Sequence, residues 1–174
     1  MTDPTTGATA RWTSVAMNTP ETAVEMAGRI RTSLQTGFEI YASVHKTLFA
    51  PVIQLAMAPF EQPAGDHLYA EMNHGEVGGN GNYGAFLRRT IPDIDIVGTA
   101  TARDETTVVA DHTITGTLPD GPLHLHSEAT YTLEEGLVVR YLVRHDHAEW
   151  QRYLRATGNP YEGGGVAAAE LDES

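Results

Sequence analysis

The second half of the chain alternates between apolar and polar residues with the two-residue period of a β-strand. Short turns with the sequences RDE, PDGP and EEG separate the alternating segments, and their Gly and Asp residues are typical of hairpins. The pattern therefore predicts an antiparallel meander of four strands, at 94–102, 107–117, 123–133 and 137–146.

The first half carries the three- and four-residue spacing of amphipathic helices instead. The tripeptide TPE at 19–21 supplies a hydroxyl cap, a proline and an acid, so a helix is expected to start there and to end at Gly37. A second helix, with Tyr41 on its apolar face, is expected to end at Pro51 because proline cannot continue a helix.

Prolines and short apolar runs predict the remaining, shorter elements. The run VIQLAM at 52–57 predicts a buried strand. Residues 83–90, stopped by Pro92, and residues 147–155 predict two short helices. The segment 60–84 is ambiguous: HLYAEMNH is compatible with a strand, and the Gly-rich stretch beyond it, which begins at a histidine, is compatible with a lid or a solvated loop. It lacks the Gly-Lys-Ser/Thr of a phosphate loop.

Charge and composition narrow the class of protein. The chain has 174 residues, with 11 Lys and Arg against 23 Asp and Glu and a formal net charge of −12. This argues against nucleic acids and anionic membranes as partners, because both require clustered cations. The absence of cysteine excludes disulfides and thiolate metal sites. Without a secretory signal or an apolar run of about 20 residues, a cytoplasmic protein is expected.

Helices followed by a bent meander and a closing helix predict an α+β fold. We expect a cone-shaped, curved, mixed or antiparallel sheet, covered by three N-terminal helices and a short C-terminal helix, with a pocket between the layers. The domain is expected to span 19–157, between a flexible arm at 1–18 and a disordered acidic tail at 158–174.

Three motifs make the chain similar to a known superfamily: LFAPVIQL after the helix pair, AFLRRTIPD before the meander and EEGLVVRYLVRHD at its end. Over residues 20–156 the chain resembles the nuclear-transport-factor-2-like superfamily, in its SnoaL-like branch of polyketide cyclases, ketosteroid isomerases and limonene-type epoxide hydrolases. The resemblance implies the cone fold and its pocket. It leaves the reaction open, because this superfamily hosts many chemistries.

The resemblance also implies which side chains line the pocket. Alternation alone turns Leu125 and Ser127 toward the helices, and the resemblance adds inward residues from the neighbouring strands. The expected substrate-binding residues are Tyr41, Leu55, Met57, Phe86, Val109, Thr113, Leu125, Ser127, Val143 and Trp150.

Asp111 is the expected general acid/base, since the resemblance places it as the inward acid of the late strands. A carboxylic acid in an apolar pocket suits proton transfer because burial disfavours its charged form. His145 is the expected partner of Asp111, and Tyr141 the expected donor to an oxyanion. An interpretation in which Asp111 and His145 only satisfy each other structurally remains open.

The chain lacks the residues that two mechanisms of the superfamily require. Alignment with limonene-type epoxide hydrolases places Asp111 at the arginine position, Thr113 and Val143 at the two acids, and Leu55 and Met57 at the tyrosine and asparagine. Ketosteroid isomerases need a carboxylate just after the second helix, where this chain reads APVIQLAMAP. The resemblance therefore favours cofactor-independent cyclisation, isomerisation or dehydration of an apolar carbonyl-containing metabolite, as in the cyclases of secondary metabolism.

Other functions and partners remain open. One alternative is a non-catalytic protein that binds an apolar small molecule, and another is a protein-interaction module. His112, His124 and His126 are expected on the outer face of the sheet, as a hydrated or dimer-facing patch rather than a metal site. We expect neither a cofactor nor a metal, and a homodimer formed through the outer face. His74 is assigned no role.

Overall fold

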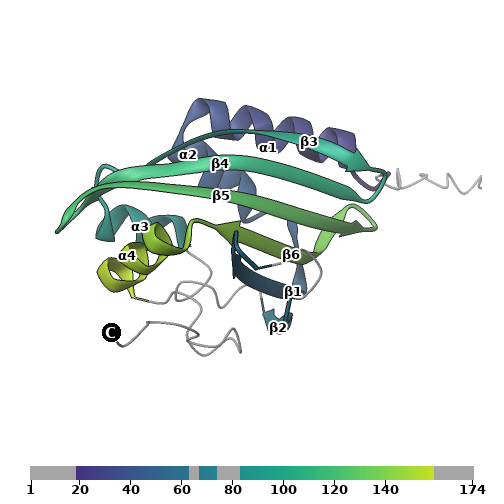
Figure 1. Ribbon diagram of the computed structural model, residues 1–174. Coiled ribbons are helices and arrows are strands. Elements are labelled where there is room, and N and C mark those ends of the chain that lie inside the picture. Colours follow the sequence, from purple (N-terminus) through teal and green to yellow (C-terminus); the bar gives the residue numbers. More distant parts are fainter. Residues whose placement is uncertain (1–18, 63–66, 74–82, 159–174) are drawn as a thin grey trace, which may run out of the picture.

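The computed structural model describes residues 19–62, 67–73 and 83–158, which form four helices and one six-stranded sheet (Figure 1). The helices are α1 (Ala23–Thr36), α2 (Phe38–His45), α3 (Tyr83–Thr90) and α4 (His147–Thr157). The strands are β1 (Phe49–Pro59), β2 (Ala70–Asn73), β3 (Asp95–Asp104), β4 (Thr107–Leu118), β5 (Gly121–Glu134) and β6 (Leu137–His145). The predicted α+β class is confirmed, and the predicted arm and the tail beyond Gly158 lie outside the described residues.

The sheet is mixed, with strand order β2-β1-β6-β5-β4-β3. Every neighbouring pair is antiparallel except β1 and β6, which run parallel. Figure 1 shows β4 and β5 as long strands that bend across the molecule, with α3 and α4 grouped near one end of it. The chain therefore places β1, from its first half, directly beside the last strand of the meander.

The first helix begins three residues later than its sequence predicts. Thr22, not Thr19, is the N-cap, and its hydroxyl accepts a hydrogen bond from the Glu25 backbone N–H at 3.2 Å. The Glu25 carboxylate accepts one in return from the Thr22 N–H at 2.8 Å. This reciprocal capping box satisfies two backbone donors at once, whereas Thr19 is exposed and precedes the helix. The helix ends at Gly37 as predicted, with φ of 126°.

The predicted extension of the second helix to Pro51 is wrong. Helix α2 ends at His45, and Pro51 lies inside β1. The pairing of β1 with β6 is irregular between Phe49 and Gln54, so a residue without an N–H is accommodated there. The segment that the sequence left ambiguous contains β2, which pairs with β1.

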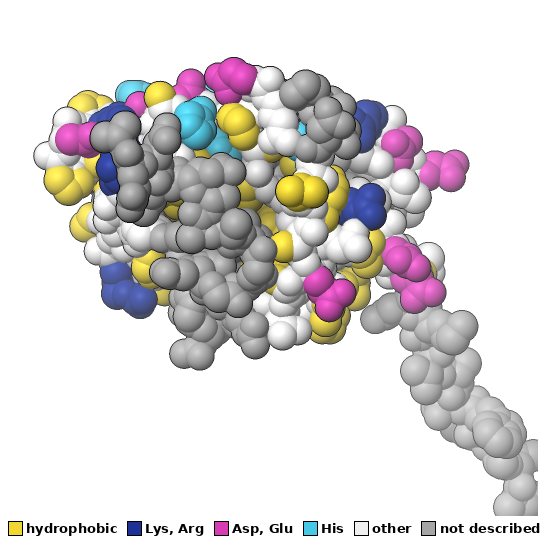
Figure 2. All heavy atoms as spheres, turned by 60° about the horizontal axis from the view of Figure 1, so that its bottom comes forward, with side chains coloured by type: hydrophobic (Ala, Val, Ile, Leu, Met, Phe, Trp, Pro, Cys, Tyr) yellow, Lys and Arg dark blue, Asp and Glu magenta, His cyan; other side chains and the backbone are white. Residues whose placement is uncertain are grey.

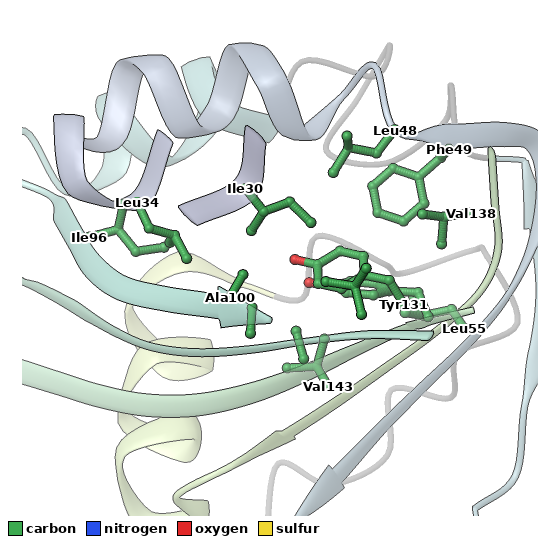
Figure 3. Packing of buried hydrophobic residues seen from close by; sticks show 14 of the residues in the cluster. Ile30, Leu34, Leu48, Phe49, Leu55, Ile96, Ala100, Tyr131, Val138 and Val143 are labelled. Carbon is green, nitrogen blue, oxygen red and sulfur yellow. The ribbon is translucent and has the colours of Figure 1, made fainter. Parts of the chain in front are cut away.

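The core lies between α1 and the inner face of the sheet. The apolar stripe of α1 is buried, and Figure 3 shows Ile30 and Leu34 pointing from the helix toward Ile96 and Ala100 of β3. Ile30 and Leu34 are each 1 % exposed. Fully burying a side chain of this size contributes roughly 1.5–3 kcal/mol, so this stripe fixes α1 against one half of the sheet and leaves the other half to the shorter helices.

On the side drawn in Figure 2, the Lys and Arg side chains of the described residues stand apart and do not merge into one patch. This agrees with the excess of acidic residues in the sequence. Among the described residues, no helix is long and apolar enough to cross a membrane.

Candidate functional site

A cavity of about 480 Å³ lies between the inner face of the sheet and helices α2, α3 and α4. Its size falls within the range of sites for small molecules. Seven of the ten predicted substrate-binding residues line it, as does the predicted catalytic Tyr141. The residues that are placed as predicted are Tyr41, Leu55, Met57, Leu125, Ser127, Tyr141, Val143 and Trp150.

Asp111 points away from this cavity, so its predicted inward placement is wrong. It pairs with Glu128 across β4 and β5, its side chain is 61 % exposed, and its Oδ2 lies 2.9 Å from Nε2 of His126. Val109 and Thr113 alternate with it on the same outer face, so their predicted places in the pocket are also wrong. The sequence analysis assigned the inward face of β4 one residue out of register, which exchanged its inward and outward side chains.

The inward residue at this point of β4 is His112, which the sequence analysis placed on the outer face. It pairs with Ser127 and lines the cavity beside it, and it is 5 % exposed. Burial lowers the pKa of His112 to about 4; the negative charge of Asp111 raises it and the nearby His126 lowers it further. The ring is therefore neutral at pH 7, and its buried Nδ1 has no hydrogen-bond partner among the described residues.

Gly98 explains how β3 approaches β4 so closely at this position. It pairs with His112, and a Cβ on residue 98 would lie 2.6 Å from the His112 Cβ and would also collide with the carbonyl oxygen of Asp111. Only a residue without a side chain fits there. Gly98 thus fixes the backbone that carries the cavity imidazole.

Tyrosines and a second histidine surround one end of the cavity. The ring centroid of Tyr41 lies 5.0 Å from that of His45 and 6.2 Å from that of His112. Tyr141 lies 5.5 Å from His45 and 4.9 Å from Tyr131. Burial raises the pKa of Tyr41 to about 12, although the hydroxyls of Tyr131 and Tyr141 act to lower it by hydrogen bonding. The Tyr41 phenol therefore remains protonated and can donate a hydrogen bond.

His145 faces inward as predicted, but it has no contact with Asp111, which lies on the opposite face of the sheet. It pairs with Ser127, is 2 % exposed, and its ring centroid lies 4.6 Å from that of Trp150. Burial lowers the pKa of His145 to about 4, His147 lowers it further and Asp146 raises it. The predicted Asp111–His145 pair therefore does not form.

Helix α3 lines the cavity, but not through Phe86, the residue that the sequence predicted. Phe86 packs against the hydrophobic core, whereas Gly84, Ala85 and Leu87 line the cavity. Gly84 lies against α2, where an added Cβ would be 2.6 Å from that of Ala42. The two short helices cross closely at this point and form one wall.

The outer face carries the remaining histidines of the strands. His124 and His126 are exposed there, while His112 is not. Across the described parts of the chain, no three His, Asp or Glu side chains are grouped closely enough to hold a metal ion. The homodimer through this face stays a prediction, and His74 lies outside the described residues.

No family model and no curated protein matches the chain. It is similar to the solved structure of a protein named as a SnoaL-like polyketide cyclase from Jannaschia sp., at 16 % identity over 79 % of this chain and 93 % of that one, with a TM-score of 0.48. It is also similar to an NTF2-like protein of unknown function from Burkholderia pseudomallei, at 18 % identity over 76 % and 97 %, with a TM-score of 0.48. A protein with a ketosteroid isomerase-like fold from Catenulispora acidiphila, in complex with trimethylamine, matches at 14 % identity over 79 % and 95 %, with a TM-score of 0.46.

Proposed function

We propose that the cavity binds an apolar small molecule that contains a carbonyl group, and that His112 transfers a proton to or from it. The observation that carries this proposal is a neutral imidazole in the wall of a mostly apolar cavity of about 480 Å³. A neutral imidazole in the wall of a cavity can accept a proton from a ligand bound there.

The reaction needs a proton acceptor and a stabilised oxygen. His112 removes a proton from the carbon next to the carbonyl, the C–H electrons form a C=C bond, and the carbonyl π electrons move to the oxygen to give an enolate. Tyr41 and Tyr141 line the same cavity, and in this proposal their hydroxyls donate hydrogen bonds to that oxygen. Return of the proton from His112 to another carbon of a conjugated enolate completes an isomerisation. Alternatively, the enolate carbon attacks a second carbonyl, whose π electrons move to its oxygen, and that oxygen takes the proton back from His112 to complete a cyclisation.

The low pKa of His112 sets a condition on this mechanism. An imidazole with a pKa of about 4 is a weak base at pH 7, because its protonated form is poorly solvated inside the cavity. The enolate places a negative charge beside the new imidazolium and so favours that protonated form. Proton transfer is therefore expected only with ligands that bring their acidic C–H close to His112.

A second candidate is binding without chemistry. Glu39 is the one carboxylate among the described residues that line the cavity, and its Oε1 accepts a hydrogen bond from Arg88 at 2.7 Å. Since the described lining offers the imidazole no unpaired carboxylate on the cavity side, the apolar wall suits a protein that carries or sequesters its ligand unchanged. The experiment below separates the two candidates.

Hydrogen–deuterium exchange tests the proposal without knowledge of the natural substrate. A panel of apolar ketones and β-diketones is incubated with the protein in D₂O, and the loss of α-proton signals is followed by NMR. The wild type is expected to accelerate exchange of at least one compound, and His112→Gln to slow that exchange on the order of 10²-fold. Binding of the same compound, measured by thermal shift, is expected to persist in the variant.

His124→Gln is the matched control, because it makes the same replacement at a histidine that is exposed on the outer face of the sheet and does not line the cavity. We expect its exchange rate to equal that of the wild type. Equal rates in His112→Gln and wild type would refute the role of His112. Thermal stabilisation of the protein by compounds that never exchange would establish the binding function instead.

A further inference from the structure

The charged side chains around the cavity carry a net positive charge, whereas the chain as a whole is negative. Four of them line it among the described residues: Glu39, Lys46, Arg88 and Arg89. Three are cations, although the chain has a net charge of −12. All four belong to α2, its C-terminal cap or α3, so the cationic rim follows these two helices.

One cation of the rim has a structural task. Nε of Arg88 donates to Glu39 Oε1 at 2.7 Å, and its NH1 donates to the carbonyl oxygens of Pro92 at 2.8 Å and Ile94 at 3.0 Å. Its guanidinium also lies over the ring of Phe38, 5.2 Å from the centroid. Arg88 therefore joins the end of α3 to the start of α2, and its charge is offset by that of Glu39.

The other two cations of the rim, Lys46 and Arg89, are available to contact a ligand. Lys46 and Arg89 are exposed, and neither side chain makes a hydrogen bond or an ion pair within the described residues. Their charges add up in the field at the opening, since the Glu39–Arg88 pair is neutral. Such a field attracts anions and raises their local concentration, and both groups donate strong hydrogen bonds to carboxylate oxygens.

We infer that the ligand of this cavity is an apolar organic acid whose carboxylate lies at the α2–α3 rim, against Lys46 or Arg89. The inference rests on the proposed function in placing the ligand inside the cavity, and it adds the chemical class of that ligand. The apolar body contacts Leu55, Met57 and Val143, while the rim holds the charge in water. A rim of this kind rejects amines and discriminates weakly among neutral compounds.

Two probes of equal chain length isolate the charge. Decanoate and decanol are compared at pH 7.5 and low salt by displacement of the neutral dye N-phenyl-1-naphthylamine from the full-length protein. Decanoate is expected to bind roughly tenfold more tightly than decanol, as for a hydrogen bond to a charged group. The preference is expected to shrink severalfold in 0.5 M NaCl, because exposed charges are screened.

A pair of double variants assigns the preference to the rim. K46A/R89A is expected to bind decanol as the wild type does and to lose its preference for decanoate. R31A/R103A removes the same two positive charges from exposed positions that do not line the cavity, and it is expected to retain the preference. Folding of both variants is checked by their thermal transitions.

The outcomes separate this inference from the proposed function. Equal or weaker binding of decanoate by the wild type, displacement by neither probe, or an undiminished preference in K46A/R89A each overturns the inference. These measurements require no turnover, so a failure of the His112-dependent exchange leaves them intact. Conversely, exchange of a neutral ketone with no preference for decanoate would support the proposed function and refute the anionic ligand.

Discussion

Between pH 7 and pH 5 the wild type is expected to lose about 2 kcal/mol more stability than a variant in which glutamine replaces His112. The imidazole is 5 % exposed, and burial lowers its pKa from the ordinary 6.5 to about 4. Between these two values the unfolded chain binds a proton that the folded protein does not. The free energy of unfolding must therefore decrease as the pH falls through this window.

The magnitude follows from the two pKa values. A difference of one pKa unit corresponds to about 1.4 kcal/mol, so the full change from 6.5 to about 4 amounts to about 3.5 kcal/mol. About 2 kcal/mol of this is lost between pH 7 and pH 5, and the rest is lost as the pH approaches 4. Above pH 6.5 the contribution is fully present, because the imidazole is neutral in both states.

Urea-induced unfolding of wild type and variant at pH 7 and pH 5 measures this quantity. Glutamine removes the titrating group, and any cost of the replacement itself cancels because each protein is compared with itself at the two pH values. His145→Gln is expected to reduce the pH dependence by a similar amount, since burial also lowers the pKa of His145 to about 4. His124→Gln, at an exposed position on the outer face, serves as the control.

One result would refute the reasoning. If His112→Gln lost as much stability between pH 7 and pH 5 as the wild type, His112 would not be a buried neutral group. Its inward placement, and with it the proposed proton transfer, would then be wrong. The pH dependence would instead come from the carboxylates, which are present in both proteins.

Two further predictions concern the backbone around the site and the first helix. Gly98→Ala is expected to destabilise the protein by about 1–3 kcal/mol and to change the NMR chemical shifts of His112, because the new Cβ would lie 2.6 Å from the His112 Cβ; unchanged stability and shifts would argue against the close approach of β3 and β4. Thr22→Ala is expected to cost about 1 kcal/mol in thermal or urea unfolding through loss of the capping box, whereas Thr19→Ala is expected to cost nothing measurable. The reverse order would place the helix start at Thr19.

The order of the elements could be predicted from the sequence because the signals are local. The EEG turn places Glu135 and Gly136 at φ of 49° and 80°, the backbone of a two-residue hairpin, and this pattern is written in the residues themselves. Helix α1 could be predicted in the same way from its apolar stripe and Gly37. The helix start differed because both Thr19 and Thr22 are plausible caps, and only the partner Glu25 distinguishes them.

Pro51 and β2 could not be predicted by the same route, because tertiary pairing decides them. A proline after an amphipathic helix normally ends that helix, but here the chain leaves α2 at His45 and pairs with β6 before it reaches Pro51. The pairing partner lies far along the sequence. No local pattern contains that information, and for the same reason the sequence analysis expected a mixed or antiparallel sheet without predicting the parallel pair of β1 and β6.

The face of β4 is the instructive difference, because the sequence did contain the answer. In TVVADHTITGT the residues Val108, Ala110 and Ile114 form one alternating apolar set, and His112 is the member that interrupts it. The family alignment favoured the other set, which contains Asp111. Since side chains alternate along a strand, a shift of one residue moves the whole set to the opposite face. The consequence is chemical: the cavity wall presents a neutral imidazole, which can accept a proton, and the carboxylate sits behind it in solvent, where it can affect the reaction only through its charge.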